Sequence, residues 1–126
     1  MRRLALTAAL LLAASALPAL AQDAPPPGQR VFRTQCGACH ALEAGKNGVG
    51  PNLHGIVGRQ MGSVAGFRYS ANIRAEAEKN TAWTEETLRN YIANPKSVLP
   101  TGTMPYAGLR NQQQLDDLVA FLKTQG

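Results

Sequence analysis

The segment Cys36-Gly37-Ala38-Cys39-His40 constrains this chain more than any other feature, because it holds the only two cysteines in 126 residues. Two residues three positions apart lie on one face of a helix, so both thiols can add to the vinyl groups of one porphyrin. The histidine that follows is then held beneath the iron, which binds a neutral imidazole nitrogen. The C-x-x-C-H spacing therefore predicts one covalently attached c-type haem, with Cys36 and Cys39 as thioether anchors and His40 as an iron ligand.

Other uses of the two cysteines are weakly supported. A disulfide between Cys36 and Cys39 would close a very short loop, and the stabilisation by a crosslink grows with loop length. A thioredoxin-like redox pair requires a βαβ context, which the sequence does not predict. A zinc site would need both cysteines together with His40 and His54, and the adjacency of Cys39 and His40 is poor geometry for one tetrahedral centre. Haem attachment is the best-supported use.

The second axial position of the iron has four alternatives: Met104, Met61, His54 or no protein ligand. A methionine in a small protein usually fills the core. Met104 differs, because two prolines fix the backbone around it and its neighbours lack helical spacing. Such a segment can hold a side chain that points inward. We therefore expect Met104 to be the ligand, and His/Met ligation raises the reduction potential of a haem.

The first 21 residues have the pattern of a secretory signal peptide. Arg2-Arg3 provides a positive start, residues 4–17 form an apolar run, and Ala19-Leu20-Ala21 is a small-x-small cleavage site. An uncleaved membrane anchor is the alternative, although the run is short for a membrane span and Pro18 interrupts it. The sequence thus favours an exported protein whose signal peptide is removed.

Cleavage after Ala21 would leave a Pro-rich leader, residues 22–27, before a single folded domain over residues 28–126. Loss of Arg2 and Arg3 takes the formal net charge from +5 to +3, and two haem propionates would bring it close to neutral. The remaining lysines and arginines are scattered, so the sequence does not indicate nucleic-acid binding. The expected location of the mature protein is the periplasm.

Hydrophobic spacing and capping residues predict an all-α fold, because no segment alternates polar and apolar residues as a half-buried strand does. A first helix is expected from residue 28 to about residue 38, and a short one over residues 72–79. Thr84 is a good N-cap for a third helix, which Asn94-Pro95 ends. Asn111 caps the last helix. The buried stripe of that helix comprises Leu115, Leu118, Val119 and Leu122.

Long loops separate these predicted helices. Residues 41–68 are rich in glycine and proline, which predicts loop structure. A loop of that length is uncommon in a compact domain unless it wraps something. Pro100, Gly102 and Pro105 predict a second extended loop. A chain of 126 residues has room for one domain. A hydrophobic core this small often needs a bound cofactor to stabilise it.

The order of short motifs along residues 28–124 resembles that of the class I cytochromes c, of the mitochondrial and soluble proteobacterial type. The motifs are Gly28-Gln29-Arg30-Val31-Phe32, Cys36-Gly37-Ala38-Cys39-His40, Gly50-Pro51-Asn52-Leu53-His54-Gly55, Gly58-Arg59, Gly66-Phe67-Arg68-Tyr69-Ser70, Trp83 before Leu88 and Tyr91, Asn94-Pro95-Lys96, and Met104-Pro105-Tyr106-Ala107-Gly108. The resemblance implies short helices and long loops around one covalent haem c. It also implies that the N-terminal helix crosses the C-terminal helix, with Gly28 and Phe32 near Leu118 and Phe121.

The resemblance further implies roles for individual residues. His40 and Met104 are the axial ligands, and the carbonyl of Pro51 accepts a hydrogen bond from the ring of His40. Tyr91 lies near the sulfur of Met104. Propionates that enter an apolar crevice need charge-assisted partners. The residues that correspond to this propionate group are Arg59, Tyr69 and Trp83. Plain core packing is the alternative for Trp83 and Tyr91.

The resemblance implies an electron carrier and not an enzyme. Such a carrier would work as a monomer and dock transiently with redox proteins, such as a membrane oxidase, a reductase, a photosynthetic reaction centre or a dehydrogenase. It would meet a membrane only through these partners. The alternatives are a haem enzyme or gas sensor, which needs an open or labile iron position, and a fixed subunit of a larger complex.

Two features depart from the mitochondrial pattern. Gln35 and Thr103 stand where lysines usually surround the exposed haem edge, while Lys96 and Arg110 remain as cations that could steer a partner. The stretch between Tyr69 and Trp83 is also longer than in the mitochondrial proteins. Both departures concern the docking partner and leave the predicted haem site unchanged.

Overall fold

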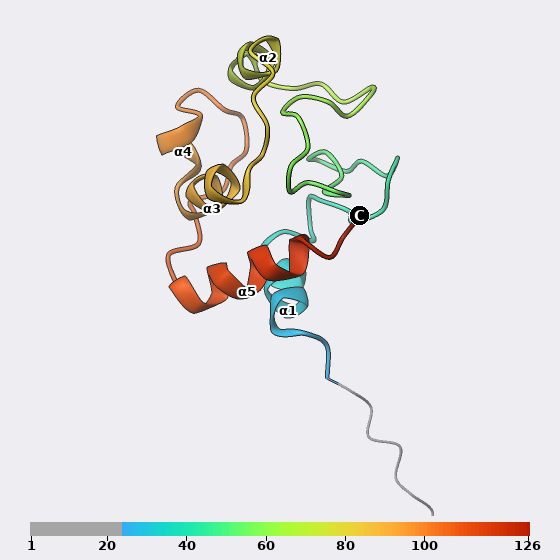
Figure 1. The fold of residues 1–126 in the computed structure, drawn as a ribbon, viewed down its shortest axis with the longest axis vertical. Coiled ribbons are helices and arrows are strands. Elements are labelled where there is room, and N and C mark those ends of the chain that lie inside the picture. The colour runs from blue at the N-terminus through green and yellow to red at the C-terminus, as the bar shows by residue number, and fades with distance from the viewer. Residues whose placement is uncertain (1–23) are drawn as a thin grey trace, which may run out of the picture.

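A computed structural model describes residues 24–126 as short helices joined by long loops (Figure 1). The helices are α1 (Pro27–Gln35), α2 (Ala71–Glu78), α3 (Glu85–Ala93), α4 (Pro95–Val98) and α5 (Gln112–Leu122). Within these residues, β-type pairing is limited to two isolated bridges, His40 with Asn47 and Gln60 with Ala82. The predicted all-α fold class is confirmed. The predicted signal peptide and its cleavage site lie outside the described residues.

The helices begin at residues whose side chains cap them. The side chains of Ser70, Thr84 and Asn111 each accept a hydrogen bond from a backbone N–H in the first turn of α2, α3 and α5. These bonds satisfy donors that the first turn of a helix otherwise leaves without a partner. The predicted caps Thr84 and Asn111 are confirmed. No helix within residues 24–126 has the length and apolar character that a membrane span requires.

The first helix is shorter than the sequence predicts, because it ends at Gln35 and not near residue 38. The carbonyl of Phe32 accepts from the N–H groups of both Cys36 and Gly37, at 2.8 Å each. The N–H groups of Cys39 and His40 then both bond to the carbonyl of Cys36. The two cysteines therefore lie on a tight turn after α1, and the expectation that they share a helix face is wrong.

Helix α4 is a second departure, because the sequence predicts no helix between Asn94-Pro95 and the extended loop at Pro100. Proline suits the first position of a helix, since its missing N–H would have no partner there. Pro95 therefore ends α3 and also begins the single turn of α4. The predicted extended loop with Pro100, Gly102 and Pro105 follows after Leu99.

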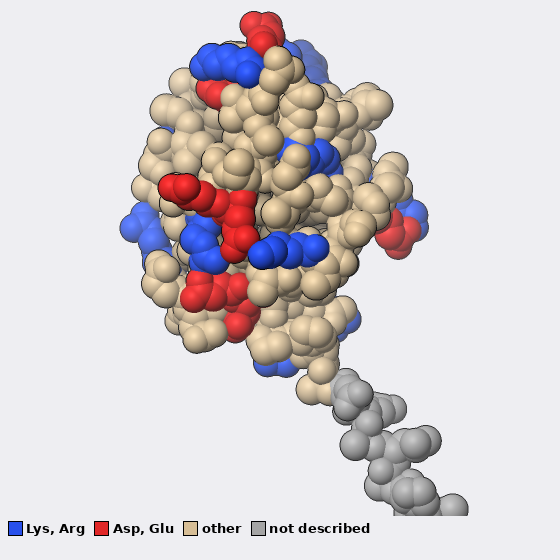
Figure 2. Space-filling model, in the orientation of Figure 1, with Lys and Arg blue, Asp and Glu red and all other residues tan. Residues whose placement is uncertain are grey.

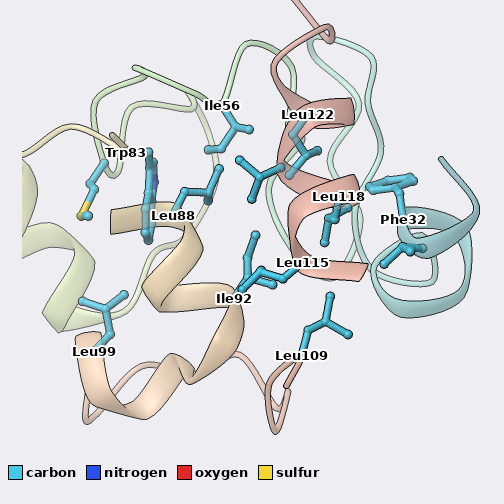
Figure 3. Close-up of a cluster of buried hydrophobic side chains, with 13 residues drawn as sticks. Phe32, Ile56, Trp83, Leu88, Ile92, Leu99, Leu109, Leu115, Leu118 and Leu122 are labelled. Atoms are coloured by element: carbon cyan, nitrogen blue, oxygen red, sulfur yellow. The ribbon is translucent and has the colours of Figure 1, made fainter. Parts of the chain in front are cut away.

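Helix α5 lies at the centre of the hydrophobic core and packs against both α1 and α3. Figure 3 shows leucines of α5 between Leu88 and Ile92 of α3 on one side and Phe32 of α1 on the other. The buried residues of α5 are the predicted Leu115, Leu118, Val119 and Leu122. The rings of Phe32 and Phe121 are 6.1 Å apart. The predicted crossing of the first and last helices is present (Figure 1).

Ion pairs also link α3 to α5 at the surface. Arg89 pairs with Asp116, and Lys123 pairs with Glu85 at 2.8 Å. Figure 2 shows acidic and basic side chains interspersed on this face of the molecule, without a large patch of one sign. Exposed pairs contribute little each, so the apolar contacts of α5 are the main link between the two ends of the domain.

Gly28 is the point of closest approach between α1 and α5, and we predict that Gly28→Ala destabilises the protein. A Cβ atom there would lie 2.0 Å from the carbonyl oxygen of Asp117 and 2.5 Å from the Cβ of Phe121. Helix propensity favours alanine by about 1 kcal/mol, but overpacking costs about 1–3 kcal/mol. We expect a net loss in the free energy of unfolding, measured by guanidinium titration of the haem-loaded protein.

A matched control is Gln113→Ala on the exposed surface of α5, which should change the free energy of unfolding by less than about 0.5 kcal/mol. A Gly28→Ala protein as stable as the wild type would contradict the close crossing.

Candidate haem-binding site

A cavity of about 370 Å³ lies among the loops and helices, and its volume is typical of cofactor sites. Its walls come from the turn after α1, both long loops, and helices α2, α3 and α5. Most of the lining side chains are apolar or aromatic. Every residue that the sequence predicts for the haem site lines this cavity: Cys36, Cys39, His40, Pro51, Arg59, Tyr69, Trp83, Tyr91 and Met104.

His40 is held in one orientation by the backbone of the loop that follows it. Its Nδ1 lies 2.7 Å from the carbonyl oxygen of Pro51. Because a carbonyl can only accept, Nδ1 carries the proton, and Nε2 keeps its lone pair for a metal. Burial lowers the pKa of His40, against the opposing effect of the Pro51 hydrogen bond. The ring is therefore suited to bind iron as a neutral imidazole.

The two cysteines are free thiols at the wall of the cavity. Burial, with a smaller contribution from the charge of Cys39, raises the pKa of the Cys36 thiol to about 11. The chain alone therefore keeps Cys36 protonated at neutral pH, unlike the thiolates of redox enzymes. Among residues 24–126, no cluster of three histidine, cysteine or acidic side chains could hold a metal ion. The zinc alternative thus has no ligand set in the described part of the chain.

Met104 lines the cavity, whereas the other candidate ligands do not. Met61 is only 1% exposed and belongs to the hydrophobic core. His54 is exposed, and its backbone carbonyl accepts a hydrogen bond from Arg59. The hydroxyl of Tyr91 donates to the sulfur of Met104 at 3.9 Å. Of the three side chains named from the sequence as candidates for the second axial ligand, Met104 is the one that lines the cavity.

Arg59 and Trp83 are brought together by the backbone. The N–H of Trp83 bonds to the carbonyl of Arg59 at 2.8 Å, and the N–H of Gly58 bonds to the carbonyl of Trp83 at 2.7 Å. Tyr69 lies at the end of the loop that carries Arg59, just before α2, and its hydroxyl accepts a hydrogen bond from the N–H of Val64. Arg59, Tyr69 and Trp83 therefore line one cavity.

The aromatic rings of Trp83 and Tyr91 pack against each other with centroids 4.9 Å apart. Trp83 is only 6% exposed, so it serves the hydrophobic core as well as the cavity wall (Figure 3). Burial raises the pKa of Tyr91, which keeps its hydroxyl protonated and able to donate to Met104. Trp83 and Tyr91 can therefore pack in the core and also belong to the cofactor site.

Two residues contribute to the site without having been assigned a role from the sequence. Gly50 packs against the ring of His40, because a Cβ there would lie 2.2 Å from Cε1. Asn52 is buried, and its backbone and side-chain oxygens accept hydrogen bonds from Arg59. The Gly-Pro-Asn motif was visible in the sequence, but spacing alone does not show that its backbone meets His40 and Arg59.

The family model described as cytochrome c matches residues 26–126. The chain belongs to the cytochrome c family. It is 48% identical over 101 residues to cytochrome c-550 of Ancylobacter novellus, which covers 79% of this chain and 94% of that protein. It is 46% identical over 116 residues to cytochrome c2 of Blastochloris viridis, covering 90% and 86%. Cytochrome c of the plant Nigella damascena is 42% identical over 97 residues, covering 76% and 85%.

Members of the cytochrome c family bind haem c covalently and carry electrons, and they are not enzymes. The residues of this chain fit that cofactor. The cavity offers two thiols, an imidazole with a free nitrogen and a thioether. Among residues 24–126, the Nε atom of Arg59 is buried without a hydrogen-bond partner. A haem propionate is the kind of acceptor that such a buried donor lacks.

We predict that Gly50→Ala displaces the ring of His40. The added Cβ would lie 2.2 Å from Cε1 and 2.6 Å from Nδ1, so the ring must leave its hydrogen bond with Pro51. Overpacking of this kind costs about 1–3 kcal/mol. The free energy of unfolding of the haem-loaded protein should fall by that amount in chemical denaturation.

The control for this variant is Lys46→Ala in the same loop, where the side chain is 67% exposed and does not line the cavity. It should change the free energy of unfolding by less than about 0.5 kcal/mol. Equal stability of the two variants would show that Gly50 does not confine His40.

Proposed function

We propose that this cytochrome c is a periplasmic one-electron carrier with a single haem ligated by His40 and Met104. The observation that carries the proposal is the pairing of Tyr91 with the Met104 sulfur at 3.9 Å, within a cavity that His40 also lines. The hydroxyl of Tyr91 orients the thioether, as the carbonyl of Pro51 orients the imidazole. Each proposed ligand thus has a second residue that holds it in place.

We further propose that Cys36 and Cys39 form the two thioether bonds and that Arg59, Tyr69 and Trp83 surround the propionates. The orphaned Nε of Arg59 supports this assignment. The remaining guanidinium nitrogens of Arg59 bond to Asn52 and His54, which leaves Nε for an acidic group. The burial of Trp83 keeps the surroundings apolar, where a charge-assisted hydrogen bond is strongest.

A bound haem supplies a one-electron couple between ferrous and ferric iron. His40 and Met104 would hold the iron, and each is kept in place by a second residue, so little reorganisation would accompany electron transfer. Apolar walls, among them Ile56, Leu88 and Ile92, exclude water from the cavity. A thioether ligand and a dry site both favour the reduced form. These features suit transfer of electrons and do not suit binding of a substrate at the iron.

The redox partners are proposed to dock transiently near the rim of the cavity, where the side chain of Val49 is 74% exposed. The ammonium of Lys96 donates to the carbonyl of Gly102, which keeps its charge beside the segment that carries Met104. Lys96 and Arg110 are the cations that we propose to steer a partner. We propose that the partner is a membrane oxidase, a reductase, a reaction centre or a dehydrogenase. The carrier itself is proposed to act as a monomer.

The proposed ligation is tested by Met104→Ala. The ferric protein should lose the sulfur-to-iron charge-transfer band, and the ferrous protein should bind carbon monoxide. The reduction potential should fall by on the order of 0.1 V, within the ~0.8 V range over which axial ligands set haem potentials. Absorption spectroscopy and a redox titration measure these changes.

The matched control is Met61→Leu, which changes a core methionine that does not line the cavity. This variant should keep the band and the potential. A Met104→Ala protein with the wild-type band and potential would exclude Met104 as the ligand, and a wild-type protein that binds carbon monoxide readily would favour a ligand-binding haem protein over a carrier.

The periplasmic location depends on the signal peptide proposed for residues 1–21. We expect the protein purified from periplasm to begin at Gln22, because cleavage follows Ala19-Leu20-Ala21. Mass spectrometry of the intact haem protein gives the N-terminus directly. Replacement of Ala19 and Ala21 by bulky residues should block processing and leave the longer chain with the membrane fraction. A mature protein that retains Met1 would contradict the proposed cleavage.

A further inference from the structure

The segment between α4 and α5 carries Met104 but contains no helix. Its backbone is tied at two places, where the N–H of Gly102 bonds to Leu99 at 3.0 Å and the N–H of Leu109 bonds to Ile92 at 2.9 Å. Within the described part of the chain, residues 103–108 make no backbone–backbone hydrogen bond. Side chains must therefore decide how firmly Met104 is held.

Besides the hydrogen bond from Lys96 to Gly102, one side-chain contact from a distant element fixes the segment before Met104. The side-chain oxygen of Asn72 accepts from the backbone N–H of Thr101 at 2.7 Å and also from its hydroxyl. These two residues are 29 positions apart in the sequence. Asn72 belongs to α2, in the stretch between Tyr69 and Trp83 that is longer than in mitochondrial cytochromes. This contact gives the longer stretch a function that the sequence does not indicate.

A second side-chain contact fixes the segment after Met104. The hydroxyl of Tyr106 donates to the side-chain oxygen of Gln35 at 2.9 Å, across 71 positions of sequence. Both residues line the cavity, and Gln35 directly precedes Cys36. The hydrogen bond therefore joins the segment that carries Met104 to the turn that carries the two cysteines.

We propose that Asn72 and Gln35 are positioning residues that anchor the segment on either side of Met104 and limit how often its sulfur leaves the cavity. The two anchors come from different helices, α2 and α1, so the segment opens only when at least one of them breaks. Local opening of a loop depends on the few contacts that hold it. The inference rests on the proposed ligation of iron by Met104.

The strength of the two side-chain hydrogen bonds sets how much the population of the open segment should change. Both contacts are partly exposed, and a hydrogen bond of this kind is worth about 0.5–1.5 kcal/mol. Loss of one anchor should therefore raise the population of the open segment about two- to tenfold. Loss of both should raise it by roughly the product of the single effects, because the anchors share no residue.

The test compares Asn72→Ala and Gln35→Leu with the oxygen-retaining variants Asn72→Asp and Gln35→Glu, all as haem-loaded full proteins. Gln113→Ala, which removes an exposed side-chain hydrogen bond on α5, is the matched control. Two rates are measured: association of imidazole with the ferric protein, and chymotrypsin cleavage after Tyr106. The second rate reports opening of the segment and does not depend on what binds the iron.

We expect both rates to rise about two- to tenfold in Asn72→Ala and Gln35→Leu, and to stay near wild type in the oxygen-retaining variants and the control. Unchanged rates in both apolar variants would overturn the proposal, as would an equal rise in Asn72→Asp and Gln35→Glu. Faster cleavage with an unchanged imidazole rate would support the anchors and instead count against Met104 as the ligand.

Discussion

The hydrogen bond from the ring of His40 to the carbonyl of Pro51 is the interaction on which the site depends. It selects the tautomer that leaves Nε2 unprotonated, and it requires a glycine at position 50 so that backbone and ring can meet. The same loop supplies Asn52, which holds Arg59. One short stretch of backbone therefore orients both the imidazole and the guanidinium that line the cavity.

Two parts of the structure support this arrangement, the helical core and the long loops. Helices α1, α3 and α5 form a small apolar core that continues into the cavity wall through Leu88, Ile92 and Leu122. The long loops have few regular backbone hydrogen bonds of their own and close around the cavity. A covalent apolar cofactor completes this core, because the loops that surround it have little else to pack against.

Local chemistry predicted much of the fold and the site, and long-range contacts account for what it did not predict. Thr84 and Asn111 cap helices because their side chains bond within the next turn, which spacing shows directly. The resemblance to cytochromes c supplied Pro51, Arg59 and Tyr91, which spacing alone could not. The early end of α1 and the start of α4 at Pro95 depend on backbone geometry that no periodicity reveals. The contacts of Gly50 with His40 and of Asn72 with Thr101 join distant segments, so neither leaves a local trace in the sequence.

The crossing of α1 with α5 also sets an order of events for a chain that is synthesised N-terminus first. Gly28 cannot find its neighbours until Asp117 and Phe121 have emerged, and these lie close to the other end of the chain. The turn with Cys36 and Cys39 emerges long before that. The thiols of Cys36 and Cys39 therefore leave the ribosome before the residues that α1 packs against. Packing of α1 against α5 then completes the apolar core that borders the cavity.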